Sequence, residues 1–189
     1  EQTKKFTDKL QIGSFELPKD QFEWIKAASH EAKRQELFNN DVVGHLKEEY
    51  YIDKISESFA QYILKCCGTS PLYDAWKNIG VLSKNAPLYI HSLWCNFQKA
   101  NEFNPPHDHG GLLSFVIYLK VPKDIKEECI KHQEIKASGG PGSIAFFMGD
   151  SDKKNSITAN SFFPEEGDIF IFPAWLKHWV YPYKSDAIR

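Results

Sequence analysis

Three histidines have the spacing and the neighbours expected of a metal site. His107 and His109 lie in the sequence Asn104-Pro105-Pro106-His107-Asp108-His109-Gly110-Gly111, beside an apolar run, and His178 follows a second apolar run near the C-terminal end of the sequence. Side chains alternate along a strand, so His107 and His109 point to one face while Asp108 points to the other. Imidazoles bind divalent metals. The pattern therefore predicts a metal site, with metal-dependent oxygen chemistry as the first hypothesis.

Two strands are predicted to hold these histidines. Residues 112–119, Leu-Leu-Ser-Phe-Val-Ile-Tyr-Leu, are rich in β-branched and aromatic residues and too short for an ordinary helix. Residues 164–168 have the composition of a turn, and residues 169–172 form a strand that Pro173 ends. His178 then comes just past a strand end, where rigid scaffolds carry functional groups.

The N-terminal half has helical patterns. Pro18 and Asp20 indicate a helix start, and a long amphipathic helix is predicted from Asn40 or Asp41 to Cys67, with Gly68 as its stop. Residues 70–78 form a further short helix. From Leu88 onward the pattern changes to strands, which include residues 143–148. The sequence predicts one α+β domain over residues 1–189, with a mainly helical flank (1–87) and a barrel of strands (88–189).

The other four histidines lack such a setting. His30 and His45 fall in charged, helix-like stretches, His132 falls in a charged loop, and His91 falls in a strand where packing explains it. We leave these four out of the predicted site.

Composition limits the class of protein. With 23 basic and 25 acidic residues the net charge is −2, which argues against a sequence-independent grip on nucleic acid. No run approaches the roughly 20 apolar residues of a membrane span, and no signal peptide is visible. The four cysteines form no CxxC motif, and the adjacent Cys66 and Cys67 are poor disulfide partners, which predicts a reduced, cytoplasmic setting. A homo-oligomer is compatible with the sequence.

The order of these motifs resembles the iron(II)- and 2-oxoglutarate-dependent oxygenases. The resemblance covers roughly residues 85 to 189 and is carried by Pro106-His107-Asp108-His109, residues 114–119, Gly167-Asp168, His178-Trp179-Val180-Tyr181-Pro182 and Arg189. It is closest to the prolyl-hydroxylase-like branch and, within it, to small oxygenases of bacteria and their phages. It implies a double-stranded β-helix, or jelly-roll, with flanking N-terminal helices. It also implies Fe(II), 2-oxoglutarate and dioxygen, and hydroxylation of an unknown substrate, such as a protein or peptide side chain.

The resemblance also implies that His107 and His178 bind the iron. In most of the superfamily the first motif is His-x-Asp, and here its last position is His109. Three readings follow: His109 completes a three-histidine triad, a bulge turns Asp108 inward as the carboxylate ligand, or His109 lies behind the ligands and leaves a position open. Alternation along the strand favours the first reading.

The resemblance also implies three residues that bind or lie beside 2-oxoglutarate. Arg189 matches the arginine that takes the distal carboxylate of 2-oxoglutarate, for which a guanidinium offers a bidentate fork. Tyr118 matches a tyrosine that bonds the same carboxylate, and Ser114, on the same strand face, lies at a position near the cosubstrate. The family's fold continues with another strand after the arginine, where this sequence ends.

Two other functions fit parts of the pattern. A cupin-like dioxygenase uses three histidines and needs no 2-oxoglutarate, so His109 favours it. A jelly-roll module could also bind a metal or ligand without catalysis. Arg189 favours the 2-oxoglutarate enzyme, and we expect its catalytic and metal-binding residues to be His107, His109 and His178.

Overall fold

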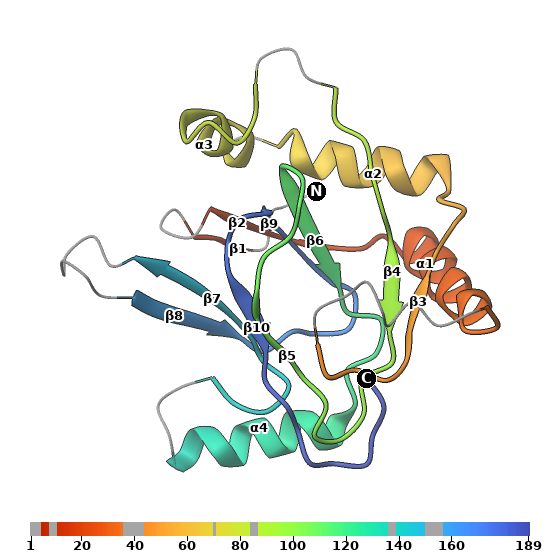
Figure 1. The fold of residues 1–189 in the computed structure, drawn as a ribbon, viewed down its shortest axis with the longest axis vertical. Helices are drawn as coiled ribbons and strands as arrows, with labels where there is room; N and C mark the ends of the chain where they lie inside the picture. The colour runs from red at the N-terminus through yellow and green to blue at the C-terminus, as the bar shows by residue number, and fades with distance from the viewer. Residues whose placement is uncertain are drawn as a thin grey trace.

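The computed structural model describes residues 5–7, 11–35, 44–69, 71–83, 87–135, 139–149 and 157–189. Within these ranges, helices pack against antiparallel strands (Figure 1). The helices are α1 (Lys19–Ala32), α2 (Glu57–Cys67), α3 (Leu72–Asn78) and α4 (Lys123–Ile135). The strands are β1 (Lys5–Thr7), β2 (Ile12–Glu16), β3 (Glu49–Tyr51), β4 (Trp94–Asn96), β5 (Asn104–His107), β6 (Leu113–Ile117), β7 (Ile144–Gly149), β8 (Ile157–Phe162), β9 (Asp168–Pro173) and β10 (His178–Val180).

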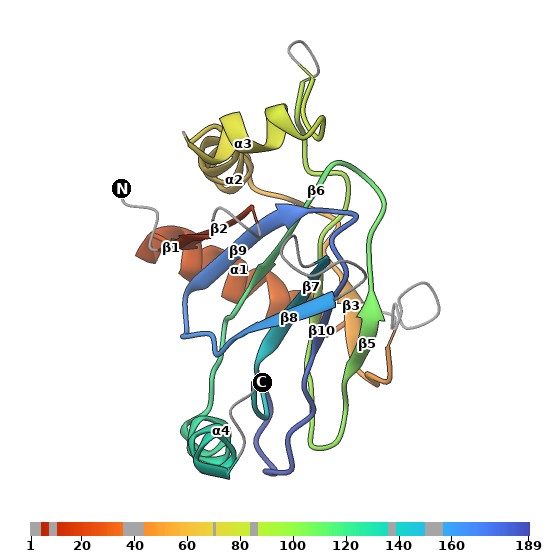
Figure 2. The ribbon, with the colours of Figure 1, turned by 90° about the vertical axis from the view of Figure 1, so that its left-hand side faces the viewer.

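The strands form two larger sheets and one small one. The first sheet has the order β1-β2-β9-β6 and the second has the order β5-β10-β7-β8, while β3 pairs only with β4. All of these pairings are antiparallel. Figure 2 shows the two larger sheets from the side. Because β2 pairs with β9, the N-terminal region predicted to be mainly helical contributes a strand beside the centre of the first sheet.

Strand β9 in the first sheet is buried on both faces, which explains its continuous apolar run. Every residue of β9 is buried. Ile169 and Ile171 belong to a core shared with the helices, whereas Phe170 and Phe172 belong to a second core that also contains Ile144 and Phe146 of β7 in the other sheet. The inner core therefore lies between the two larger sheets, and even-numbered residues of β9 face it.

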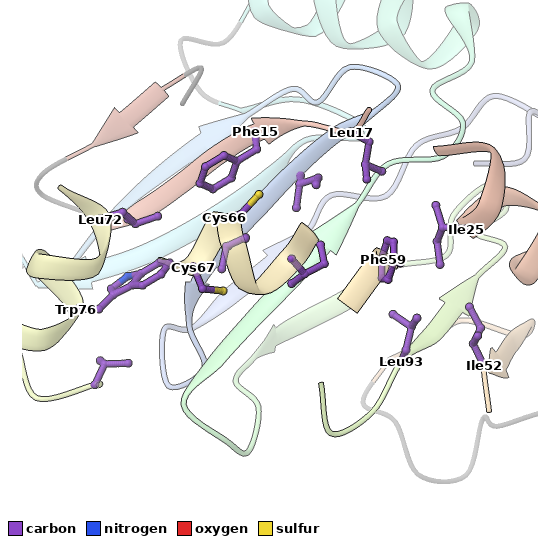
Figure 3. Close-up of a cluster of buried hydrophobic side chains, with 14 of the residues drawn as sticks. Phe15, Leu17, Ile25, Ile52, Phe59, Cys66, Cys67, Leu72, Trp76 and Leu93 are labelled. Atoms are coloured by element: carbon purple, nitrogen blue, oxygen red, sulfur yellow. The ribbon is translucent and has the colours of Figure 1, made fainter. Parts of the chain in front are cut away.

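Helices α1, α2 and α3 cover the outer face of the first sheet. Their buried side chains meet sheet residues in one cluster (Figure 3). Trp76, Leu72 and Phe15 gather at one end of this cluster, and Phe59 and Ile25 lie toward the other. Phe59 and Trp76 are fully buried. The helices therefore pack on the outside, and the inner core beside the histidines is formed mainly by residues of the two larger sheets.

The C-terminal segment that carries Arg189 is anchored by α4. Ile125 and Cys129 of α4 are buried. The Glu128 carboxylate accepts hydrogen bonds from the backbone N–H groups of Lys184 and Ser185 at 3.0–3.1 Å. Helix α4 thereby fixes the course of the chain leading into Arg189.

Several predicted elements differ from the structure. The long helix predicted to Cys67 is wrong over residues 44–56, where β3 forms instead, and its predicted start lies outside the described residues. Tyr50 is buried and pairs with Cys95 of β4, so tertiary pairing overrides the helical spacing. His45 is not helical, His91 precedes β4 rather than lying in a strand, and His132 lies in α4 rather than in a loop.

Other predictions are confirmed. Helix α1 begins directly after Pro18, and the strands expected around residues 112–119, 143–148 and 169–172 form as β6, β7 and β9. All four cysteines are free thiols. Among the described residues, no helix has the length and apolar character needed to cross a bilayer.

Candidate metal centre and cosubstrate pocket

The three predicted histidines converge at one point inside the protein. Each offers a nitrogen that lies within 4.8 Å of the nitrogens offered by the other two. The ring centroids of His107 and His178 are 4.4 Å apart, and that of His109 is 4.9 Å and 5.0 Å from them. Two nitrogens bound to one ion at about 2.1 Å lie at most about 4.2 Å apart. Small ring rotations would therefore let a single ion bind all three.

Strand pairing places two of these rings side by side. His178 of β10 lies directly opposite His107 of β5, with an irregularity in register just beyond them. Strand β5 is the edge of its sheet, and its pairing with β10 is irregular across Pro105 and Pro106, which lack N–H groups; edge strands and bulges are the places where a sheet tolerates proline. His109 lies past the end of β5, and its N–H donates to the Ala174 carbonyl at 2.9 Å. This bond ties the third histidine to the end of β9.

Backbone carbonyls orient two of the rings. His107 Nδ1 lies 2.6 Å from the Pro105 carbonyl oxygen, and His178 Nδ1 lies 2.9 Å from the Leu176 carbonyl oxygen. A carbonyl only accepts, so Nδ1 carries the proton in both rings and Nε2 keeps its lone pair. This tautomer is the one in which Nε2 can bind a metal.

Burial keeps these imidazoles neutral. It lowers the pKa of His178 to about 3 and that of His109 to about 4, and it also lowers the pKa of His107. His107 further lowers the pKa of His109, and both of these rings lower the pKa of His178, because each added positive charge would repel the next. Metal ligation requires unprotonated imidazole, so at neutral pH the cluster is ready for a cation.

The carboxylate of Asp108, which lies between His107 and His109 in the sequence, points away from the histidine cluster. Asp108 Oδ2 accepts a hydrogen bond from Lys177 Nζ at 2.8 Å on the surface, and this ion pair lowers the pKa of the Asp108 carboxyl. The reading in which a bulge turns Asp108 toward the metal therefore does not match the structure. His109, by contrast, offers its nitrogen to the same point as the other two rings, which favours the reading in which it completes a three-histidine triad.

The three predicted cosubstrate residues line the same cavity as the histidines. This cavity has a volume of about 1250 Å³, and its wall includes Ser114, Tyr118 and Arg189. Ser114 pairs with Phe172 of β9, and Tyr118, just past β6, belongs to the inner core. The sequence-predicted residues are thus brought together from β5, β6, β10 and the C-terminal segment.

Two of these groups suit an anionic ligand. The hydroxyl of Tyr118 is buried and has no hydrogen-bond partner among the described residues, and burial raises the pKa of this phenol to about 12, so it remains a donor. The Arg189 guanidinium lies 5.4 Å from the Tyr118 ring centre. Its hydrogen bonds go to the Gly142 carbonyl and the Gln98 side-chain amide, and no side-chain carboxylate of the described ranges pairs with it. A cation without a counter-ion beside a free hydroxyl donor fits a carboxylate.

Residues 92–189, just over half of the chain, match a family model described as "Putative 2OG-Fe(II) oxygenase". The chain belongs to this family. No curated protein and no solved structure gives a match. The family's cofactor and cosubstrate are iron(II) and 2-oxoglutarate, and the cluster of His107, His109 and His178 fits iron binding. The resemblance found in the sequence is therefore confirmed at the level of the family.

The ring of Trp94 in β4 lies 5.7 Å from that of His109. Sequence reasoning missed two further aromatic neighbours of the site, Phe146 and Phe172, whose rings pack against His178 with centroids 5.9 Å and 4.8 Å away. These aromatic walls follow from strand alternation in β7 and β9, which could have been read once the pairing was known. The contact between Gln98 and Arg189 joins residues too distant in sequence for any local pattern to indicate.

Proposed function

We propose that this protein is an iron(II)- and 2-oxoglutarate-dependent dioxygenase that hydroxylates a substrate. One observation supports this most: three neutral imidazoles converge in a cavity whose wall also holds Arg189 and the buried hydroxyl of Tyr118. Within the part of the chain that the structure describes, no side-chain carboxylate pairs with this arginine and no group bonds this hydroxyl. These groups match the two ends of 2-oxoglutarate. Its keto-acid end chelates iron, and its other end is a carboxylate.

The imidazoles of His107, His109 and His178 would hold the iron. Bound iron(II), with 2-oxoglutarate and dioxygen, supplies hydroxylation of a C–H bond coupled to release of succinate and carbon dioxide. The Pro105 and Leu176 carbonyls hold two of the rings by their Nδ1–H groups, so these ligands need little reorganisation on binding. The packing of Phe146 and Phe172 on His178 excludes water from that side.

The distal carboxylate of 2-oxoglutarate would lie between Arg189 and Tyr118. The guanidinium supplies charge and N–H donors, and the phenol supplies one O–H donor. Ser114 projects from the same face of β6 toward the same cavity and would lie beside the cosubstrate.

The fold is consistent with this proposal. We take the two four-stranded sheets as the walls of a double-stranded β-helix within a single domain, because the inner core and the histidines lie between them. Assignment to the prolyl-hydroxylase-like branch, and with it a protein or peptide side chain as the substrate, rests on the resemblance of the sequence motifs.

A second candidate function is favoured by one observation. The third ligand position holds the imidazole of His109, whereas a ferrous site of two histidines and one carboxylate is the common arrangement. A neutral ligand leaves the metal more positive, as in cupin-like dioxygenases that act without 2-oxoglutarate. A jelly-roll module that binds metal without catalysis has the same ligands.

Anaerobic titration with iron(II), with and without 2-oxoglutarate, separates these functions. Chelation of iron by 2-oxoglutarate should produce a visible charge-transfer band, and admission of oxygen should then release succinate. Iron binding without this band would favour the cupin-like function if another substrate is oxidised, and the non-catalytic module if none is.

The variant Arg189→Ala tests whether this arginine binds 2-oxoglutarate. It should weaken 2-oxoglutarate binding about 100-fold or more while iron binding stays unchanged, because losing one partner of a desolvated pair costs about 3 kcal/mol or more. Equal affinity of the variant and the wild type for 2-oxoglutarate would remove Arg189 from the site.

A further inference from the structure

An amide inside the fold holds the guanidinium of Arg189. Gln98 lies just past β4 and is only 4% exposed. Its Nε2 donates to the Glu102 carbonyl at 2.6 Å, and its Oε1 accepts a hydrogen bond from Arg189 Nη2. The carbonyl can only accept and the guanidinium can only donate, so the orientation of the amide is fixed by both neighbours.

The backbone of Gln98 is also hydrogen-bonded to the C-terminal segment that carries Arg189. Its N–H donates to the Arg189 carbonyl at 2.9 Å, and the Arg189 N–H donates to the Gln98 carbonyl at 3.0 Å. The buried hydroxyl of Tyr183 also donates to the Gln98 carbonyl. A change of the Gln98 side chain leaves these backbone bonds in place, so the effect of the amide can be separated from the course of the chain.

The amide binds the arginine without neutralising it. Both acceptors of the guanidinium, the Gln98 amide and the Gly142 carbonyl, are uncharged. A glutamate at position 98 would accept a hydrogen bond from the same N–H group of Arg189, and its negative charge would neutralise the guanidinium. A side chain without an acceptor would remove one of these two hydrogen bonds and leave the Gly142 carbonyl to hold the guanidinium near the Tyr118 ring, which lies 5.4 Å from it.

We propose that Gln98 is a positioning residue for the cosubstrate. It holds the Arg189 guanidinium toward Tyr118 while keeping its charge available for the distal carboxylate of 2-oxoglutarate. This inference rests on the proposed function of Arg189 and adds the residue that gives this arginine its direction and its unpaired charge.

The test compares two 2-keto acids on iron-loaded protein without oxygen. 2-Oxoglutarate has the distal carboxylate, whereas 2-oxobutyrate has only the keto-acid end. The variants are Gln98→Met, of similar size and without an amide, and Gln98→Glu, which adds a charge. Gln133→Glu makes the same chemical change at an exposed position of α4 and serves as the control.

We expect Gln98→Glu to weaken 2-oxoglutarate binding by about tenfold or more, because the added carboxylate neutralises the guanidinium. We expect Gln98→Met to weaken it by several-fold, because the hydrogen bond that directs the guanidinium is lost. Affinity for 2-oxobutyrate and for iron should stay unchanged in both variants. In an Arg189→Met background, Gln98→Met should have no further effect on 2-oxoglutarate affinity, because its action passes through the arginine.

Three outcomes would overturn the inference. Unchanged 2-oxoglutarate affinity in both variants would show that the amide does not direct the arginine. An equal loss for both keto acids would show a general structural role, as would additive effects in the double variant. If the Glu variant does not fold, the Met variant and the double variant still decide. Wild-type protein that binds iron but has no affinity for 2-oxoglutarate would instead overturn the proposed function and this inference with it.

Discussion

Removing one oxygen atom from Tyr118 should have opposite effects on stability and on cosubstrate binding. The side chain is 5% exposed, and its hydroxyl has no hydrogen-bond partner. Its ring packs edge-on against Phe170, with centroids 6.1 Å apart, and lies beneath Arg189. Tyr118→Phe keeps these ring contacts and removes only the hydroxyl.

Without ligand the variant should be more stable than the wild type. A buried polar group without a partner costs about 1–3 kcal/mol, and its removal recovers part of that cost. For a chain of this length, each 1 kcal/mol shifts the melting temperature by about 2–4 °C. Thermal unfolding of the metal-free protein should therefore show a rise of a few degrees.

The affinity for 2-oxoglutarate should change in the other direction. A hydrogen bond from the phenol to a carboxylate contributes about 1.5–3 kcal/mol, so its loss should weaken binding roughly 10- to 150-fold. Calorimetric titration of the iron-loaded, oxygen-free protein measures this directly. Iron affinity should not change, because the residues proposed to bind the metal are the three clustered histidines and not Tyr118.

A second tyrosine provides the control for the sign of the stability change. The buried Tyr183 hydroxyl donates to the Gln98 carbonyl, so Tyr183→Phe removes a hydrogen bond that is formed in the folded protein and should lower the melting temperature. If Tyr118→Phe also lowers stability, or if it binds 2-oxoglutarate as tightly as the wild type, the hydroxyl is not held for the cosubstrate and our reasoning fails.

Three further predictions concern the metal and a buried acid. Stoichiometric iron binding should persist in Asp108→Ala and should be lost or weakened by orders of magnitude when any cluster member is changed to Ala: His107, His109 or His178. In His109→Asp, iron binding should survive and succinate release should persist or rise, since a carboxylate restores the common ferrous ligand set; loss of iron there would mean that the site requires the length of imidazole. Burial, with a smaller effect of Glu102, raises the pKa of Glu49 to about 7. Its carboxyl ionises near 4.5 when unfolded and only near 7 when folded, so stability is lost as pH rises between these values. Relative to wild type, Glu49→Gln should therefore gain up to about 3 kcal/mol of unfolding free energy between pH 5 and pH 8 in denaturant titrations, and a constant difference would refute the raised pKa.

The amino-acid sequence by itself determined which histidines cluster and where the central strands lie. Alternation placed His107 and His109 on one face and Asp108 on the other, and the structure has that arrangement even though His109 lies beyond the end of β5. Strands β6 and β9 were also readable, because a sheet buried on both faces needs continuous apolar runs. These features depend on local periodicity, which the sequence displays directly.

Tertiary structure alone decided the remainder. The helix predicted before Cys67 is replaced over part of its length by β3, because pairing with β4 stabilises Tyr50 in a strand despite the helical spacing of its neighbours. Strand β2 pairs with β9, a strand that lies far from it in the sequence. Gln98 contacts Arg189 because the fold brings two distant chain segments side by side. Such contacts depend on which surfaces are buried together, and that is a property of the whole fold.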